Sequence, residues 1–144
     1  MAETQQSTVD LHIVSAEGEL FAGPAAMVLV SGCMGDLGIL PRHAPLLSLL
    51  KAGELRVKTP DGQEHSYFVG GGVLEVQPHK ITVLADTAAR ARDLDEAAAL
   101  EAKQRAEEAL QDKTGHIDLA HAQAELARAA AQLKLIERLR KLRS

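Results

Sequence analysis

Along the first ninety residues, apolar and polar positions alternate with a period of two. Between Thr8 and Ser15 the apolar side chains stand at positions 9, 11 and 13, and polar side chains stand at 8, 10 and 12. This period is typical of a β-strand with one buried face. Further short apolar segments follow at 20–21, 25–30, 37–39, 46–50, 55–58, 65–69, 73–76 and 81–84. Their short lengths and close spacing predict an antiparallel β-sandwich or flattened barrel.

Turn residues separate the predicted strands. The clearest turn is Thr59-Pro60-Asp61-Gly62, because proline is favoured second in a type I turn and glycine accepts the left-handed conformation at its end. It predicts a β-hairpin. Gly70-Gly71-Gly72 is a different case, since a phosphate-binding loop would need a helix to begin at the glycines and a strand follows instead. We interpret the triple glycine as a β-bulge or a close crossing of two strands.

The period changes near residue 86, and from Asp93 onward the sequence has no proline and is dominated by alanine. Asp93 followed by Glu96 matches a capping box, which predicts a first helix from about Leu94 to Gln111. The apolar stripe expected on this helix consists of Leu94, Ala98, Ala102, Ala106 and Ala109.

A second helix is predicted from Asp118 to about Leu142, after a break at Lys113-Thr114-Gly115. The short connection predicts an antiparallel helical hairpin. The seam expected on the second helix consists of Leu119, Ala122, Leu126, Ala129, Leu133 and Ile136. The predicted fold class is therefore α+β, with an N-terminal antiparallel β-sandwich in residues 1–88 and a C-terminal antiparallel two-helix hairpin in residues 89–144.

The hairpin is weakly held by its own packing, because facing alanines bury little apolar area. Leu135, Leu139 and Leu142 form a second apolar strip outside the main seam. Two interpretations stay open at this point. The strip packs on the sandwich, or the helix leaves its place and binds elsewhere.

The net charge of −4 is unevenly divided. Residues 1–89 carry 10 acidic and 5 basic side chains, whereas residues 90–144 carry 10 acidic and 11 basic ones. The basic excess gathers at the end of the second predicted helix, at Lys134, Arg138, Arg140, Lys141 and Arg143. Nucleic-acid binding is not expected, because this cluster lacks aromatic partners and the molecule is acidic as a whole.

Several other classes of protein are also disfavoured. The longest apolar runs fall far short of the ~20 residues of a membrane-spanning helix, and the first eight residues lack the features of a secretory or mitochondrial signal. We therefore expect a protein of a bacterial-type cytoplasm. Cys33 is the single cysteine, which fits a reducing compartment, and we expect it to be a half-buried apolar residue.

Residues 35–45 combine two glycines and two prolines with an acidic and a basic candidate, Asp36 and His43. Such a segment has a fixed backbone shape and fits either a docking edge or a reactive site. An enzyme using Asp36 and His43 as an acid–base pair is one hypothesis, but no nucleophile stands near them in the sequence. The histidines lack the spacing of a metal site, and none is predicted; they are residues 12, 43, 65, 79, 116 and 121.

With these elements in order, the chain resembles the epsilon subunits of bacterial F-type, proton-translocating ATP synthases. The resemblance runs from about Val9 to Arg140. The segments that carry it are 35–46 (GDLGILPRHAPL), 71–76 (GGVLEV), 83–88 (VLADTA), 93–97 (DLDEA) and 124–127 (AELA). Several separate motifs in the same order make a chance match improbable.

The resemblance implies a non-catalytic subunit of the rotor, in the central stalk. It implies that the sandwich links the gamma subunit to the membrane c ring for proton-driven ATP synthesis, while catalysis occurs on the alpha and beta subunits. The hairpin would be a regulatory domain that extends along gamma and inhibits ATP hydrolysis. The implied location is the cytoplasmic side of the bacterial plasma (inner) membrane, peripherally attached. The alternative is an adaptor unrelated to an ATPase, with a sandwich and a helical binding arm.

The resemblance also assigns residues to these contacts. Asp36, with Gly35, matches the acidic loop that faces the c ring. His43, with Arg42, matches the position beside gamma. The inhibitory stretch of the second helix corresponds to Leu126, Arg128, Leu133, Ile136, Arg138 and Arg140. The basic end would suit acidic segments of alpha and beta.

One motif departs from the pattern of those relatives that bind ATP at the hairpin. Their Ile/Leu-Asp-x-x-Arg-Ala sequence reads here as residues 94–99, with Ala98 in the place of the arginine. Losing one charge-assisted contact costs about tenfold or more in affinity. Asp95, Arg105 and Arg128 remain as candidates for a weak nucleotide site. We expect weak or absent ATP binding and no other cofactor.

Overall fold

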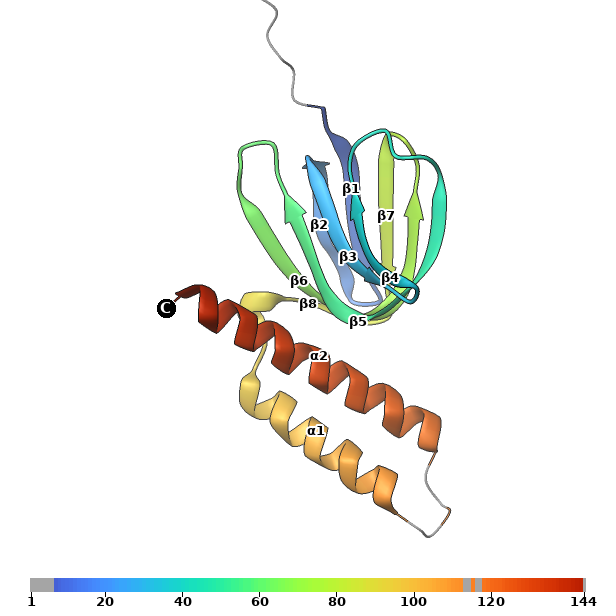
Figure 1. Ribbon diagram of the computed structural model, residues 1–144, viewed down its shortest axis with the longest axis vertical. Coiled ribbons are helices and arrows are strands. Elements are labelled where there is room, and N and C mark those ends of the chain that lie inside the picture. Colours follow the sequence, from blue (N-terminus) through green and yellow to red (C-terminus); the bar gives the residue numbers. More distant parts are fainter. Residues whose placement is uncertain (1–6, 113–114, 116–117, 144) are drawn as a thin grey trace, which may run out of the picture. The chain divides into compact units, whose positions relative to one another are not determined.

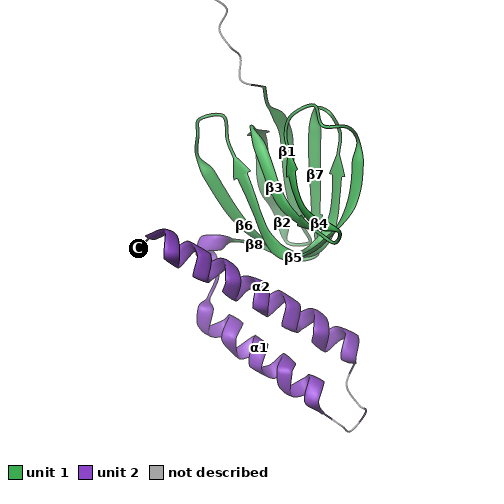
Figure 2. Cartoon of the chain, in the orientation of Figure 1, with its two compact units in different colours: residues 1–90 green, residues 91–144 purple. Residues whose placement is uncertain are grey.

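The computed structural model describes residues 7–112, 115 and 118–143. The chain divides into two compact units, Met1–Arg90 and Ala91–Ser144 (Figure 2). Of the elements that the structure describes, the first unit contains the strands and the second contains the two α-helices. This division lies two residues after the boundary expected at residue 88.

The first unit is a β-sandwich built from one eight-stranded sheet that folds over on itself (Figure 1). Its order is β2-β1-β7-β6-β5-β3-β4, and β8 pairs with β6. The strands are β1 Val9–Ser15, β2 Gly18–Ala25, β3 Met27–Gly32, β4 Gly35–Ile39, β5 Leu46–Lys58, β6 Glu64–Val76, β7 Lys80–Ala85 and β8 Ala88–Arg90.

Two strands are longer than the sequence predicts. The segments expected at 46–50 and 55–58 join into β5, and those at 65–69 and 73–76 join into β6. The glycines between the segments bend the strands rather than break them. Gly53 fits because a Cβ there would lie 2.7 Å from Ser31 Oγ. The hairpin predicted at Thr59–Gly62 is confirmed, since the Gly62 N–H donates to the Thr59 carbonyl at 3.0 Å.

The strand pairs are antiparallel with one exception, in which β1 runs parallel to β7 with Leu11 opposite Ile81. The predicted antiparallel β-sandwich is confirmed, and this pair is an exception within it. A parallel pair needs a long crossover connection, which here runs through β2 to β6. Turn residues between consecutive strands do not indicate that β1 and β7, which are far apart in the sequence, pair in parallel.

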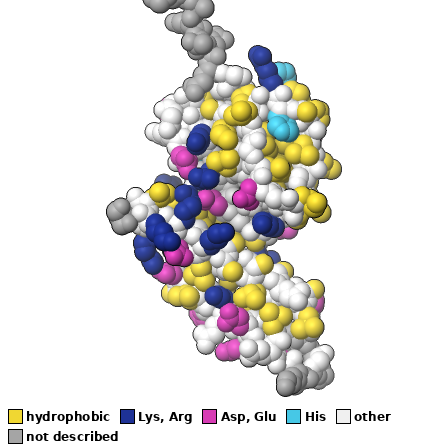
Figure 3. Space-filling view, in the orientation of Figure 1, with side chains coloured by type: hydrophobic (Ala, Val, Ile, Leu, Met, Phe, Trp, Pro, Cys, Tyr) yellow, Lys and Arg dark blue, Asp and Glu magenta, His cyan; other side chains and the backbone are white. Residues whose placement is uncertain are grey.

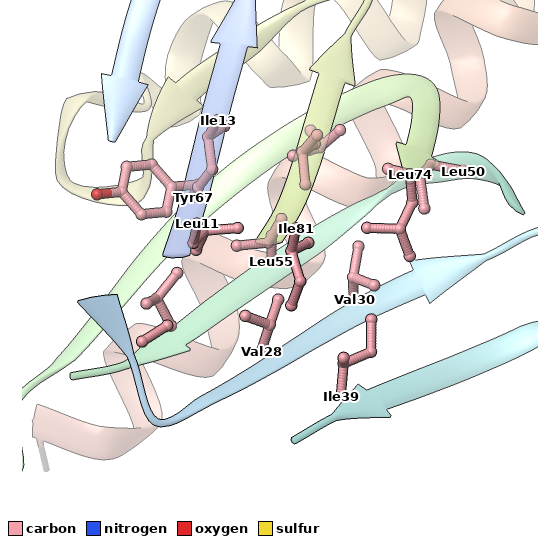
Figure 4. Close-up of a cluster of buried hydrophobic side chains, with 14 of the residues drawn as sticks. Leu11, Ile13, Val28, Val30, Ile39, Leu50, Leu55, Tyr67, Leu74 and Ile81 are labelled. Atoms are coloured by element: carbon pink, nitrogen blue, oxygen red, sulfur yellow. The ribbon is translucent and has the colours of Figure 1, made fainter. Parts of the chain in front are cut away.

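The core lies between the layers of the sandwich, and its pattern follows the alternation in the sequence. In β1 the side chains of Val9, Leu11 and Ile13 are buried, as predicted. Residues from most other strands point toward them (Figure 4), among them Val28, Val30, Ile39, Leu50, Leu55, Tyr67, Leu74 and Ile81. The described residues include no buried charged side chain.

The triple glycine is a corner of the sheet. Strand β6 pairs with β8 up to Val69 and with β7 from Gly72 onward. Gly71 and Gly72 have φ angles of +100° and +140°, and a Cβ on Gly72 would lie 2.2 Å from the Leu84 carbonyl oxygen. The predicted close approach of two strands is confirmed.

The second unit begins with a short 3-10 turn, η1 Ala91–Asp93, followed by α1 Glu96–Gln111. The cap of α1 was predicted at Asp93, and this is wrong by two residues. The Asp95 carboxylate accepts hydrogen bonds from the N–H groups of Ala97 and Ala98, at 3.0 and 3.3 Å. Asp93 is taken up by the 3-10 turn, so the helix starts later than the capping-box pattern suggests.

The antiparallel hairpin is completed by α2 Leu119–Arg143 (Figure 1). Its buried alanines are Ala99 and Ala106 in α1 and Ala122 and Ala129 in α2. The predicted stripes are wrong at one position each, because Ala98 is exposed and Leu119 is 55% exposed. Ala98 lies one position from Ala99 on the helix, and Leu119 is the first residue of α2. The predicted break falls largely outside the described residues, but Gly115 has the left-handed φ of +75°.

Candidate functional site

The hairpin of β3 and β4 presents an acidic tip. Gly32 pairs with Gly35 across a two-residue turn formed by Cys33 and Met34, and Asp36 follows. Asp36 is exposed and Met34 is 99% exposed. The expectation that Cys33 is half-buried is wrong, because it sits in this turn and is exposed.

Cys33 anchors the tip to the sheet through its backbone. Its N–H donates to the Leu49 carbonyl of β5 at 3.0 Å. Gly35 has a φ of +132°, a conformation that L side chains rarely adopt. The backbone therefore fixes where the Asp36 carboxylate stands while leaving it open to solvent.

The chain after β4 is fixed by a second set of backbone contacts. Arg42 has a φ of +65°, and its N–H donates to the Pro78 carbonyl in the β6–β7 turn at 2.9 Å. His43 is half-buried, and its Nδ1–H donates to the Ala44 carbonyl at 2.7 Å. In the neutral ring this leaves Nε2 as an acceptor for a partner.

Asp36 and His43 do not form a pair. Asp36 lies near the turn end of β4, while His43 follows the opposite end of the strand. The four residue-to-residue steps from Asp36 to Leu40 span roughly 13 Å at the rise of an extended strand. The acid–base pair of the enzyme hypothesis is therefore not assembled, whereas two separate contact points are.

A row of apolar side chains crosses the outer face of the sheet. Leu49 of β5 lies opposite Val73 of β6, Val73 opposite Leu84 of β7, and Leu84 beside Val14 of β1. Leu49 is 65% and Leu84 is 53% exposed, and Leu47, two residues earlier on β5, is 72% exposed. We call Val14, Leu47, Leu49, Val73 and Leu84 the outer apolar row.

Sequence reasoning missed this row, although one signal was present. The run Leu46–Leu50 carries leucine at both parities. In a strand, successive side chains point to opposite faces, so a run of this kind must place leucines outside as well as inside. Leu50 is buried, while Leu47 and Leu49 are exposed.

A charged cluster borders the outer apolar row on β1. His12, two residues before Val14 and on the same face, bonds Asp10 Oδ2 through Nε2 at 3.0 Å and Glu19 Oε1 through Nδ1 at 3.1 Å. These hydrogen bonds, with that to Asp10 the larger effect, raise the pKa of His12 above its ordinary value. Both ring nitrogens donate only when the ring is protonated, so this geometry is that of an imidazolium. The sequence analysis missed this cluster as well.

The residues assigned to the inhibitory stretch all lie on α2. Five are half-buried and Arg140 is exposed; the five are Leu126, Arg128, Leu133, Ile136 and Arg138. Basic side chains gather over the C-terminal part of the helix (Figure 3). Of the second apolar strip, Leu135 is buried, Leu139 is half-buried and Leu142 is 68% exposed.

Asp95 is not brought together with the other two candidates for a nucleotide site. Asp95 caps α1, and Arg105, which is exposed, lies ten residues along the same helix, roughly 15 Å away at 1.5 Å per residue. Arg128 lies on α2, twelve residues before Arg140, which contacts the first turn of α1. Weak or absent ATP binding stays a prediction.

Within the part of the chain that the structure describes, no three His, Cys, Asp or Glu side chains are grouped so that they would hold a metal ion. Among the described helices, none combines the length and the apolar character needed to cross a membrane.

Two family models match this chain, one for each unit. The model described as ATP synthase, Delta/Epsilon chain, beta-sandwich domain matches residues 8–91. The model described as ATP synthase, Delta/Epsilon chain, long alpha-helix domain matches residues 92–137.

Curated relatives match over nearly the whole chain. The ATP synthase epsilon chain of Nitrosococcus oceani is 61% identical over 134 residues, covering 93% of this chain and 96% of the relative. That of Halorhodospira halophila is 60% identical over 137 residues, covering 94% and 96%.

Solved structures share the fold. A chain in the structure of the Euglena gracilis mitochondrial ATP synthase, described as OSCP/F1/c-ring, superposes with a TM-score of 0.71 at 17% identity, covering 100% of this chain and 86% of that one. A chain in the central stalk and c ring of the Tetrahymena thermophila mitochondrial ATP synthase gives a TM-score of 0.59 at 11% identity, covering 92% and 99%.

Proposed function

This chain belongs to the family of ATP synthase epsilon chains, and from that membership we propose that it is a non-catalytic subunit of the central stalk. In this proposal the sandwich joins the gamma subunit to the c ring of a proton-translocating synthase. The hairpin restrains ATP hydrolysis on the alpha and beta subunits. The complex holds the subunit peripherally, on the cytoplasmic side of the bacterial inner membrane.

The observation that carries the docking proposal is the outer apolar row. Contiguous apolar side chains on the surface of a monomer mark interaction sites, and here four strands contribute to one row. A row built on a sheet is also rigid, which suits a joint that transmits torque. We assign this row to the contact with gamma.

The two residues expected to contact gamma, Arg42 and His43, lie toward one end of the row. Arg42 is tied by its backbone to the β6–β7 turn, and that turn follows Val76, which pairs with Leu46. Leu47 is the next residue along β5. Arg42 and His43 would thus add polar contacts at the margin of an apolar interface, which is the usual arrangement at a protein–protein interface.

Asp36 and Gly35 are proposed to face the c ring. The exposed tip between β3 and β4 supports this, because it offers a carboxylate to basic loops at the membrane surface. An exposed pair of this kind contributes only ~0–1 kcal/mol. The c-ring contact would therefore need several such contacts, and the gamma contact would carry most of the affinity.

The test of the docking proposal replaces Leu49 or Leu84 with glutamate and measures binding of the subunit to a gamma-containing complex that lacks it. Both side chains are largely exposed, so thermal unfolding of the isolated chain should not change. Affinity for the complex should fall at least about tenfold, because a carboxylate would be buried against an apolar partner. Leu100→Glu is the matched control, since Leu100 is 52% exposed and lies on α1.

Undiminished affinity in both variants would contradict the assignment of the outer apolar row to gamma. Failure of the unaltered chain to bind any gamma-containing complex would contradict the stalk proposal itself. That second outcome would favour the alternative of an adaptor unrelated to an ATPase.

A further inference from the structure

An ion pair joins the two helices at the open end of the hairpin, opposite their connection. Arg140 Nη2 donates to Glu96 Oε2. Glu96 is the first residue of α1, and Arg140 lies in the last turn of α2. Each charge already complements the dipole of its own helix. Glu96 and Arg140 would therefore each stabilise its own helix even without the ion pair between them.

The remaining contacts of the seam are weak for its length. Among the described residues of α1 and α2, the buried side chains are the alanines at 99, 106, 122 and 129 together with Leu135. Each of the four alanines removes little apolar area from water. In the described part of the chain, Lys103–Glu107 in α1 and Lys141–Glu137 in α2 are ion pairs within a single helix, and His121 contacts Glu125 within α2. These three contacts stabilise a helix without holding the helices together.

Resting on the proposed inhibitory role of α2, we infer that Glu96 and Arg140 form a latch that sets how readily the hairpin opens. While the latch is closed, the Arg140 guanidinium is bound to a carboxylate of its own chain. When the hairpin opens, the same guanidinium becomes available to a carboxylate-rich surface on the catalytic subunits. Glu96 thereby competes with the partner for one basic side chain.

Because of this competition, substituting Glu96 and substituting Arg140 should have different effects on the inhibition of ATP hydrolysis. Glu96→Gln breaks the latch and leaves Arg140 charged, so inhibition should increase. Arg140→Gln breaks the latch and also removes the charge that the partner would bind. A pair that only stabilised the fold would not separate the two variants in this way.

The latch itself is tested on the isolated full chain by amide hydrogen exchange at Ala106, in the middle of the seam. The side chains of Arg140 and Glu96 are 62% and 44% exposed, and exposed pairs have small effects, so we expect exchange about two- to fivefold faster in Glu96→Gln. Arg140→Gln should give the same increase, and the double variant no further one. High salt should remove the difference.

The matched control is Glu107→Gln, which neutralises an α1 carboxylate paired within its own helix. Its exchange at Ala106 should equal that of the unaltered chain. Equal exchange in Glu96→Gln and Glu107→Gln would overturn the latch. So would fully additive effects of Glu96→Gln and Arg140→Gln.

The regulatory consequence is tested in the assembled ATP synthase by the rate of ATP hydrolysis. Glu96→Gln should lower the rate below that of Glu107→Gln, and Arg140→Gln should lower it less or not at all. Faster exchange without any change in hydrolysis would leave the latch in place but overturn its competition with the partner. Whether α2 inhibits at all is decided separately, by removing the hairpin.

Discussion

At the scale of single residues, backbone conformation decides where the sheet turns and where contact side chains stand. Gly72 lets β6 approach β7 closely at the corner, and Arg42 adopts a left-handed conformation held by its hydrogen bond to Pro78. Neither the corner at Gly72 nor the conformation of Arg42 buries additional apolar surface. Both determine where side chains of the proposed docking surfaces lie.

Gly72→Ala should be strongly destabilising. A Cβ would lie 2.2 Å from the Leu84 carbonyl oxygen, at a φ of +140°. Backbone strain and overpacking each cost about 1–3 kcal/mol, so a loss of more than about 2 kcal/mol in the free energy of unfolding is expected. Denaturant unfolding measures it. Gly62→Ala is the control, since Gly62 also has a positive φ but open space around it, and a loss no greater than in that control would contradict the argument.

His12 should make stability depend on pH. Hydrogen bonds to Asp10 and Glu19 raise its pKa above the ordinary 6.5. Because the folded state binds this proton more tightly, the contribution is fully present below the unfolded pKa and is lost as pH rises through the folded one. The difference in unfolding free energy between the unaltered chain and His12→Gln should therefore be larger near pH 6 than near pH 9. A difference independent of pH would show that the imidazolium contributes nothing.

At the scale of elements, periodicity alone identified most of the strands and both helices. Period-two alternation predicted β1 with its buried face, and the Thr59–Gly62 turn predicted the β5–β6 hairpin, because both depend on residues adjacent in the chain. The parallel pairing of β1 with β7 depends on residues far apart, so no local signal announced it. The cap of α1 was misplaced for another reason, since Asp93 and Asp95 offer equivalent side chains and only the preceding 3-10 turn distinguishes them.

The candidate site likewise has a part that the sequence predicted and a part that it did not. The fixed shape of residues 35–45 was predicted from their glycines and prolines, and the exposed carboxylate of Asp36 fits that expectation. The partners assigned to Asp36 and His43 stay predictions. The outer apolar row was missed because it exists only once β1, β5, β6 and β7 are placed side by side, and a single strand shows no more than one or two of its members.

At the scale of the whole molecule, the chain consists of two units with different kinds of stability. Residues 9–85 surround a core of large aliphatic side chains, whereas the described residues of the two helices bury four alanines and one leucine, Leu135, and share an exposed ion pair. The first unit is therefore suited to a lasting contact with other subunits. The second unit is suited to a change of conformation in which its two helices separate.

Removing the second unit should separate the two functions. A chain ending after Arg90 keeps every strand, so it should still bind a gamma-containing complex with unchanged affinity. ATP hydrolysis by the assembled complex should rise, because the proposed inhibitory helix is gone. Hydrolysis assays on complexes rebuilt with either chain measure this. Unchanged rates would mean that this hairpin does not inhibit.

The parallel pairing of β1 with β7 also has a consequence for synthesis on the ribosome. Strand β1 is synthesised first, but its parallel partner β7 is synthesised near the end of the same unit. Val14 can therefore contact Leu84 only after nearly ninety residues have left the exit tunnel. Shorter nascent chains carry the leucines of β5 but not the assembled row. Contacts so distant in sequence form slowly. The subunit thus becomes competent for assembly in a single late step, and an interrupted translation product would be unable to take a place in the stalk.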